Sequence, residues 1–318
     1  MRRLGRLTLR LLLALAILAV LLGLGAWALL RASLPRDEGA VEVAGISGPV
    51  TVERDARGVP TIRGGSFEDV VFGLGFVHAQ ERFLQMDLTR RYAAGRLTEL
   101  LGPGWFTEDR HRAAYDHERA GERHLAALPA EHRRLLERYA AGVDAGLDDL
   151  GARPPAYLLL RKTPAPWRPL DTMLVGAAFH EMLSYGERAE RPLLTLEKAF
   201  PPEVVEFLTP DASRADALPL GDPSPPPPLP IPGPELVDLR DRPYEPKKDL
   251  VHVFGEVPGS NNWAVTGTRT AHGGAILAGD PHLQISVPGV WFRAGLEWRD
   301  GDRVRRAVGA TAPEIGRA

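Results

Sequence analysis

The chain has 318 residues, of which 44% are hydrophobic and 25% charged. These proportions are ordinary for a globular protein and exclude wholesale disorder, collagen-like repeats and a multi-span membrane protein. Because 39 Lys and Arg stand against 41 Asp and Glu, no global basic field exists and no nucleic-acid partner is expected. The chain contains no cysteine, so disulfides, cysteine-ligated metals and cysteine nucleophiles are excluded, and an oxidising compartment poses no redox problem.

The N-terminus has the pattern of an export signal that also anchors the chain. Residues 1–10 contain four arginines and no acid, and 20 uncharged residues follow from Leu11 to Leu30. At about 1.5 Å per residue, this run spans a hydrocarbon core about 30 Å thick. We expect residues 1–35 to be an uncleaved signal anchor in the inner membrane, with the remainder exported to the periplasmic side. A cleaved signal peptide is the alternative, since Ala26-Trp27-Ala28 fits a cleavage site, although it lies inside the apolar run.

A short hairpin and a helix are predicted next. Strands are expected from Val50 to Arg54 and from Val59 to Ile62, with a turn between them. Ser66 has the spacing of a helix N-cap, because acids follow in the first turn. The pair Arg90-Arg91 farther along this helical region is interpreted as a charged helix face and not as a nucleic-acid patch.

The middle of the chain is predicted to alternate helices with proline-rich breaks. Apolar residues four apart predict an amphipathic helix over about 131–150. A loop is expected over 154–169 because of its prolines, and helix from Leu170 to about Phe200. Between Pro219 and Pro234 nine of 16 residues are proline, and proline lacks the N–H that helices and inner strands need. This stretch predicts an extended spacer.

After the spacer the pattern changes to short strands separated by glycine turns. The change predicts a boundary near residue 255 between an α-rich part and the start of an antiparallel sheet, and so an α+β fold. The expected strands are Trp263 to Val265, Ala275 to Ala278, Val290 to Trp298 and Arg303 to Val308.

Ser260 is the candidate nucleophile, at the point where the spacer meets the first of these strands. A serine hydroxyl is a weak nucleophile without a base, and no G-x-S-x-G elbow surrounds Ser260 to support an α/β-hydrolase triad. If the bond between Gly259 and Ser260 is cut, Ser260 gains an α-amine, whose unperturbed pKa of about 7.7–8 suits a general base. Glycine before the serine leaves room for the strained backbone that attack on its carbonyl requires. Taken alone, the segment also fits an ordinary turn.

Four stretches together resemble the penicillin acylase (penicillin amidase) family of N-terminal-nucleophile hydrolases. Gly259 to Val265 resembles the family's autoprocessing site, and Val52 to Ile62 resembles its opening hairpin. Phe76 to Leu97 is similar to its first long helix, and Pro166 to Asp171 to a motif later in the α region. The resemblance covers about residues 45–310.

The resemblance implies an αββα sandwich that is present here only in part. It also implies α and β chains cut from one precursor: an α-chain region over 36–218, a spacer over 219–259 and a β chain from 260 to 318. The implied reaction is hydrolysis of a carboxamide through a Ser260 acyl-enzyme, with the α-amine of Ser260 relaying the proton. No cofactor is required, although family members often bind calcium.

His282 lies 22 residues after Ser260, directly behind Asp280-Pro281. At this place penicillin G acylases carry glutamine, whereas cephalosporin acylases and acyl-homoserine-lactone acylases carry histidine, so His282 resembles the second group. Its imidazole could orient the Ser260 amine or a water by hydrogen bonding; a turn histidine that merely caps a strand is the alternative. The expected substrate is a small N-acyl compound, such as a β-lactam side-chain amide or an acyl-homoserine lactone.

Phe179, Met182 and Leu183 lie where the resemblance places part of the acyl pocket. A helix core would explain these apolar residues equally well.

The resemblance also places a calcium-binding glutamate near Glu187 and Glu190, although Arg188 stands at the expected position. Calcium needs about six to eight oxygen ligands, so a solvated helix face is the favoured interpretation of these acids.

The family's β chain continues far beyond Ala318. The resemblance places the asparagine and the second backbone N–H of the oxyanion hole in that continuation, and such donors typically each contribute about 10²–10³ in rate. The alternative function is therefore an inactive, truncated family remnant that acts at most as a membrane-tethered binding protein.

Overall fold

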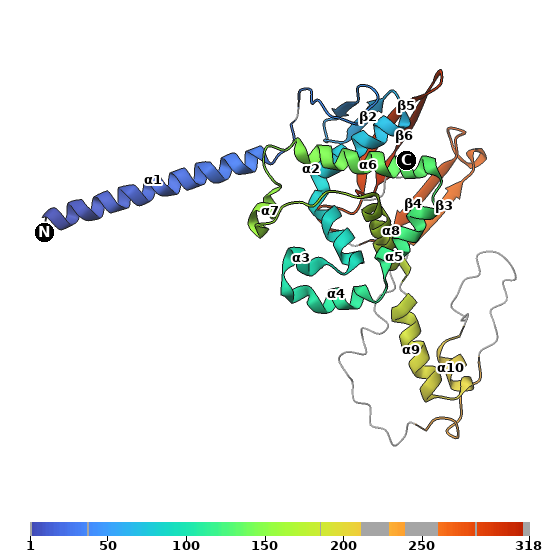
Figure 1. Ribbon diagram of the computed structural model, residues 1–318. Coiled ribbons are helices and arrows are strands. Elements are labelled where there is room, and N and C mark those ends of the chain that lie inside the picture. The colour runs from blue at the N-terminus through green and yellow to red at the C-terminus, as the bar shows by residue number, and fades with distance from the viewer. Residues whose placement is uncertain are drawn as a thin grey trace. The chain divides into compact units, whose positions relative to one another are not determined.

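The computed structural model describes residues 2–36, 38–184, 186–210, 229–238, 260–283 and 285–313 (Figure 1). These residues divide into unit 1, formed by Met1–Met182 and Ser286–Ala318, and unit 2, formed by Leu183–Ile285. Helices dominate, and each unit contains one sheet. The predicted α+β class is therefore confirmed.

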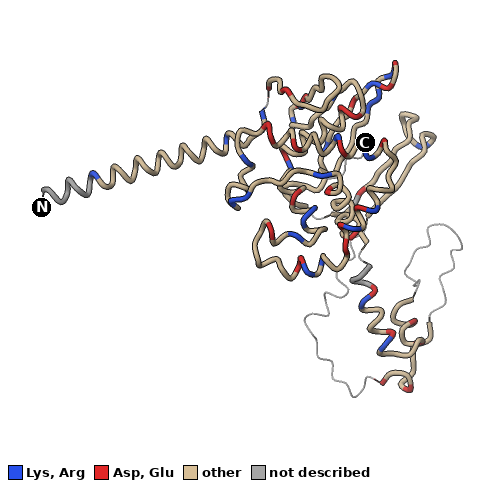
Figure 2. Tube along the Cα trace, in the orientation of Figure 1, with Lys and Arg blue, Asp and Glu red and all other residues tan. Residues whose placement is uncertain are grey.

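Helix α1 (Arg2–Ala32) is long and apolar enough to cross a membrane. Its segment Arg10–Ala32 has a mean hydropathy of 2.6, and none of it is buried against the protein. Figure 2 shows that no charged residue interrupts the helix between Arg10 and Arg31. The predicted apolar run is thus a single continuous helix.

The sheet of unit 1 has the strand order β1-β2-β5-β6. Strands β1 and β2 form an antiparallel hairpin, as do β5 and β6, and the two hairpins join through a parallel pairing of β2 with β5. Both predicted hairpin strands and the predicted strands near 290–298 and 303–308 are confirmed. The four strands after the spacer were expected to begin one antiparallel sheet, but in the described residues they are divided between two sheets, and β5 pairs in parallel with β2. The bounds are β1 (Thr51–Arg54), β2 (Pro60–Gly64), β5 (Phe292–Asp300) and β6 (Arg303–Thr311).

The turn between β1 and β2 is fixed by one carboxylate. Asp55 accepts hydrogen bonds from the backbone N–H groups of Arg57 and Val59, both at 2.9 Å. These two bonds lower the pKa of Asp55. Gly58 adopts φ 78° in this turn, a left-handed conformation that glycine takes without strain.

Helices α2 (Phe67–Ala94) and α6 (Ala130–Asp148) pack against each other and cover one face of this sheet (Figure 1). The predicted N-cap is confirmed, because the Ser66 side chain accepts a hydrogen bond from the backbone N–H of Asp69 at 3.1 Å. The predicted amphipathic helix over 131–150 is α6. The core between the helices and the sheet includes Ile62, Val70, Leu74, Val77, Met86, Tyr139, Val143, Phe292, Ala294 and Leu296.

The two helices approach closely because glycines line their contact. A Cβ at Gly142 or Gly146 of α6 would overlap the carbonyl oxygen of Phe72 or Phe76, respectively. A Cβ at Gly75 of α2 would overlap the carbonyl oxygen of Tyr139. Any larger residue at these positions forces the helices apart.

Shorter helices complete unit 1, and one of them corrects a prediction. Residues 154–169 were expected to be a loop, but they contain helix α7 (Pro155–Leu160). Proline is tolerated in the first turn of a helix, where its missing N–H needs no partner, and Tyr157 anchors this turn in the core. The other elements are α3 (Leu97–Leu101), η1 (Pro103–Trp105), α4 (Phe106–Ala113), α5 (His117–Ala127) and α8 (Pro169–Ser184).

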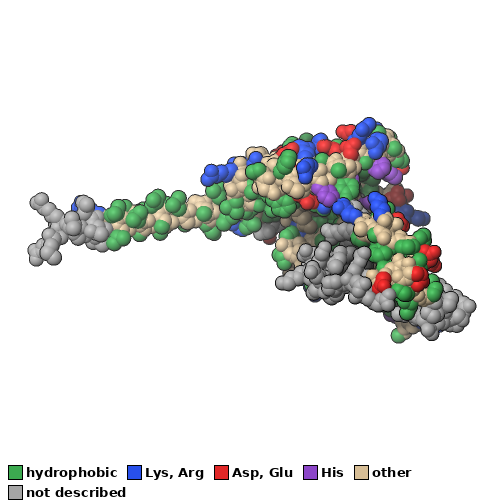
Figure 3. All heavy atoms as spheres, turned by 90° about the horizontal axis from the view of Figure 1, so that it is seen from below, with side chains coloured by type: hydrophobic (Ala, Val, Ile, Leu, Met, Phe, Trp, Pro, Cys, Tyr) green, Lys and Arg blue, Asp and Glu red, His purple; other side chains and the backbone are tan. Residues whose placement is uncertain are grey.

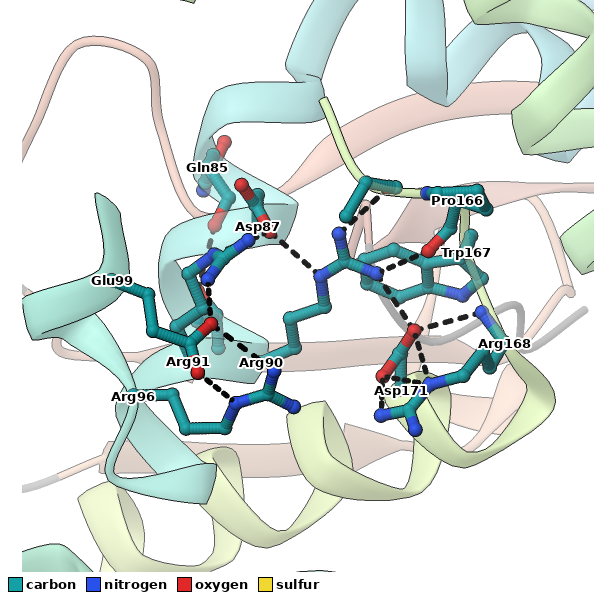
Figure 4. Close-up of polar contacts among 12 residues, drawn as sticks. Gln85, Asp87, Arg90, Arg91, Arg96, Glu99, Pro166, Trp167, Arg168 and Asp171 are labelled. Atoms are coloured by element: carbon teal, nitrogen blue, oxygen red, sulfur yellow. Dashed lines mark hydrogen bonds and ion pairs between the residues drawn. The ribbon is translucent and has the colours of Figure 1, made fainter. Parts of the chain in front are cut away.

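A buried cluster of charges links α2 to the first turn of α8 and to the segment before it (Figure 4). The guanidinium of Arg90 donates to Asp87 Oδ1 at 2.8 Å and to Asp171 Oδ2 at 2.7 Å. It lies 4.9 Å from the Trp167 ring centroid, and the Tyr157 hydroxyl donates to Asp87 Oδ2 at 2.5 Å. The interpretation of Arg90 as part of an exposed charged face is wrong, because its side chain is buried.

Unit 2 contains α9 (Gly186–Ala199), α10 (Pro202–Leu208) and an antiparallel pair of strands, β3 (Ser260–Val265) and β4 (Ile276–Pro281). Together α8 and α9 confirm the helical prediction to about Phe200. Of the predicted spacer 219–259, the structure describes only 229–238, so the remainder of that prediction lies outside the described residues.

Candidate active site

Ser260 is the first residue of β3, and its side chain is exposed. The register of the β3–β4 pair places Ser260 opposite Pro281 and Asn261 opposite Asp280. His282 directly follows Pro281, the residue paired with Ser260. The β3–β4 pairing therefore brings the two catalytic candidates close together. Gly259 lies outside the described residues, and the geometry of the predicted cleavage bond is therefore not part of the described site.

His282 is hydrogen-bonded to Asp280. Its Nε2 lies 2.9 Å from Asp280 Oδ2, and both side chains are exposed. With Nε2–H donating to the carboxylate, Nδ1 is the basic nitrogen of the neutral ring. A carboxylate in this position fixes the tautomer and orientation of an imidazole. His282 was predicted from the sequence, whereas a role for Asp280, two residues before it, was not.

The acyl-pocket candidates lie on or beside α8. Phe179 is half-buried, and its ring centroid lies 6.5 Å from that of Trp291, directly before β5. Met182 and Leu183, which follow on the same helix, are exposed. That exposure speaks against a helix-core role for these two residues. Trp291 was not predicted as a site residue, because the strand was expected to begin at Val290, whereas β5 begins at Phe292.

The described acids do not by themselves form a calcium site. Glu190 is exposed on α9, and the side chain of Glu187 lies outside the described residues. Within the part of the chain that the structure describes, no three His, Asp or Glu side chains gather so as to hold a metal ion. Calcium binding therefore stays a prediction.

One buried histidine in unit 1 was not recognised from the sequence. His78 Nε2 lies 3.0 Å from Thr311 Oγ1, and Nδ1 lies 2.8 Å from the Tyr139 hydroxyl. Because the Thr311 hydroxyl donates to the Phe292 carbonyl at 3.1 Å, it accepts from His78 Nε2–H, and Tyr139 donates to Nδ1. Burial, with a smaller effect of the Arg82 charge, lowers the pKa of His78 to about 3. This neutral histidine joins α2, α6 and β6.

Comparisons with known proteins all point to acylases. The family model described as penicillin amidase matches residues 49–316. The penicillin acylase 2 proenzyme of Pseudomonas sp. (strain SE83) is 33% identical over 293 residues, covering 90% of this chain and 36% of that protein. The acyl-homoserine lactone acylase QuiP of Pseudomonas aeruginosa is 32% identical over 262 residues, covering 81% of this chain and 30% of that protein.

A solved structure, the thermostable penicillin G acylase from Alcaligenes faecalis in tetragonal form, is 25% identical with a TM-score of 0.48. The match covers 55% of this chain and 98% of that chain. This chain spans about a third of the length of the two Pseudomonas relatives. Because the family model matches from the first hairpin nearly to the last residue, the chain belongs to the penicillin amidase family.

Proposed function

We propose that the protein is an exported amidohydrolase that hydrolyses a carboxamide bond through a serine acyl-enzyme, after cutting its own chain between Gly259 and Ser260. The single observation that carries this proposal is the position of Ser260. It is the first residue of a paired strand and directly follows the glycine at which the family resemblance expects cleavage.

The cut requires no second protein. Ser260 Oγ attacks the Gly259 carbonyl carbon, and the amide nitrogen of Ser260 leaves as an amine once it has gained a proton. Water then hydrolyses the resulting ester, which leaves a Gly259 carboxylate and a Ser260 residue with a free hydroxyl and a free α-amine. The β3–β4 pairing supports this step, because it holds Ser260 in place at the strand end.

Amide hydrolysis uses the same hydroxyl. Ser260 Oγ gives its proton to the Ser260 α-amine and attacks the substrate's carboxamide carbon. The α-amine passes the proton to the leaving nitrogen, and water cleaves the acyl ester to release the carboxylic acid. His282, oriented by Asp280, is proposed to position the α-amine or the attacking water.

The substrate proposed is a small N-acyl compound with an apolar acyl group. One relative is named a penicillin acylase and another an acyl-homoserine lactone acylase. Phe179, Met182 and Leu183 are proposed to contact the acyl group, and Trp291 lies against Phe179. Histidine at 282 favours the acyl-homoserine-lactone and cephalosporin branch.

The protein is proposed to act on the periplasmic side of the inner membrane, held there by α1. Support comes from the arginine-rich start of the chain and the apolar length of α1.

Intact-mass measurement on the expressed full-length gene product tests the proposal. We expect two chains, one of which begins at Ser260. The Ser260→Ala variant should give one uncut chain, while Ser286→Ala, which changes another exposed serine, serves as the matched control and should still be cut. An uncut chain that hydrolyses amides at the full rate would contradict the proposal.

A further inference from the structure

The C-terminal end of α1 is fastened to unit 1. The Ala152 N–H donates to the Ala32 carbonyl, which ends α1, at 3.1 Å. Arg36 pairs with Asp149 at 3.3 Å. Ser33 is buried, and its hydroxyl donates to Leu30 O at 2.7 Å. The segment that follows α6 therefore lies beside the C-terminal end of α1, where the apolar part of that helix ends.

Helix α7 begins three residues after Ala152, and it presents a leucine to the outside. Tyr157 is fully buried, with its hydroxyl on Asp87 at 2.5 Å. Leu159 stands two residues later, about 200° around the helix, and is 85% exposed. The helix cannot turn Leu159 inward without withdrawing the Tyr157 hydroxyl from Asp87. Leu158 and Leu160 on either side are half-exposed.

Basic residues flank this leucine on both sides. Arg153, Arg161 and Lys162 are exposed, and Arg153 Nη1 donates to the Lys162 carbonyl at 2.7 Å, which closes the loop around α7. From Gly151 to Leu170 the sequence contains no Asp or Glu. An exposed apolar residue with cations on both sides, in a stretch of 20 residues without an acid, has the composition of a segment that lies in a membrane interface.

The figures agree with this placement. Figure 1 shows α7 beside the end of α1, within the same unit. Figure 3 shows basic side chains where α1 meets the rest of unit 1, next to the hydrophobic surface of α1. A bilayer that surrounds α1 therefore meets the surface next to α7 first.

We propose that residues 151–163, called the α7 loop, bind the surface of the same bilayer that holds α1. Leu159 inserts at the boundary between headgroups and acyl chains, and Arg153, Arg161 and Lys162 contact lipid phosphates. This inference rests on the proposed anchoring by α1. Its consequence is that unit 1 is held in one orientation at the membrane, at two points instead of one.

The absence of cysteine in the chain gives a direct test. Full-length protein is reconstituted in vesicles that contain phosphatidylglycerol, with one introduced cysteine carrying an environment-sensitive fluorophore. Leu159→Cys should be quenched by nitroxide-labelled lipids roughly twofold or more above Val304→Cys. Val304 is the matched control, because it is 64% exposed on β6 in the same unit.

Leu21→Cys, in the middle of α1, separates failure of this inference from failure of the anchoring. If Leu21 is quenched by the lipids and Leu159 behaves like Val304, the α7 loop inference is overturned while the anchor stands. If neither Leu21 nor Leu159 is quenched, both proposals fail. Arg161→Glu with Lys162→Glu should reduce quenching at Leu159→Cys; unchanged quenching would overturn the phosphate contacts.

Discussion

Asp280 Oδ2 lies 2.9 Å from His282 Nε2, on the strand that pairs with the strand of Ser260. The carboxylate holds the imidazole in one orientation beside the proposed nucleophile. Because His282 is exposed, few other contacts of the protein restrain it.

Asp280→Ala should therefore lower kcat of amide hydrolysis about tenfold or more, by freeing the imidazole, while leaving KM nearly unchanged. Asp280→Asn keeps an acceptor oxygen for Nε2–H and should restore most of the rate. Kinetics of both variants on an N-acyl substrate provide the measurement. Equal rates for the alanine and asparagine variants would contradict a positioning role.

Arg90→Met should lower the free energy of unfolding by about 3–5 kcal/mol, because it leaves the buried carboxylates of Asp87 and Asp171 without their shared cation. Arg96→Met is the matched control: that arginine pairs with Glu99 on the surface and should cost less than about 1 kcal/mol. Urea unfolding followed by circular dichroism compares the two. Similar losses of unfolding free energy in both variants would show that the buried cluster stabilises the fold no more than a surface ion pair does.

Gly142→Ala should destabilise the protein by about 1–3 kcal/mol or more, since its new Cβ overlaps the Phe72 carbonyl of α2. Gly176→Ala, on α8, should instead stabilise the protein. A Cβ there meets nothing within 4 Å, and alanine favours a helix over glycine by about 1 kcal/mol. Thermal unfolding should move the two midpoints in opposite directions.

His78 should make stability depend on pH in the acidic range. Its pKa is about 3 in the folded chain and about 6.5 when unfolded, so between these values the unfolded state binds the extra proton. Stability is therefore complete above about pH 6.5 and falls as the pH drops toward 3. His78→Gln should flatten this slope in urea unfolding at several pH values. An unchanged slope would assign the acid sensitivity to other groups.

Local patterns predicted most helices and strands, because they depend on neighbours in sequence. The N-cap at Ser66 and the periodicity that gave α6 are examples. Helix α7 was missed, since Pro164, Pro166 and Pro169 were interpreted as excluding helix from all of 154–169, although they follow α7 and Pro155 stands at its first helical position.

Long-range contacts could not be predicted in this way. Arg90 was assigned to the surface because nothing local shows that Asp171, 81 positions later, closes the cluster. For the site, Ser260 and His282 came from the resemblance, and the strand register then placed them near each other. Asp280 and Trp291 became visible only through the contacts they make.

The parallel join between β2 and β5 has a consequence for the order of events during maturation. Its two strands stand on opposite sides of Ser260 in sequence, and His78 and Thr311, 233 positions apart, bind each other across the same divide. Backbone scission at Ser260 would thus leave both fragments interlocked as a nicked heterodimer. The sheet of unit 1 can also be completed only after β5 and β6, which follow Ser260 in sequence, have been synthesised.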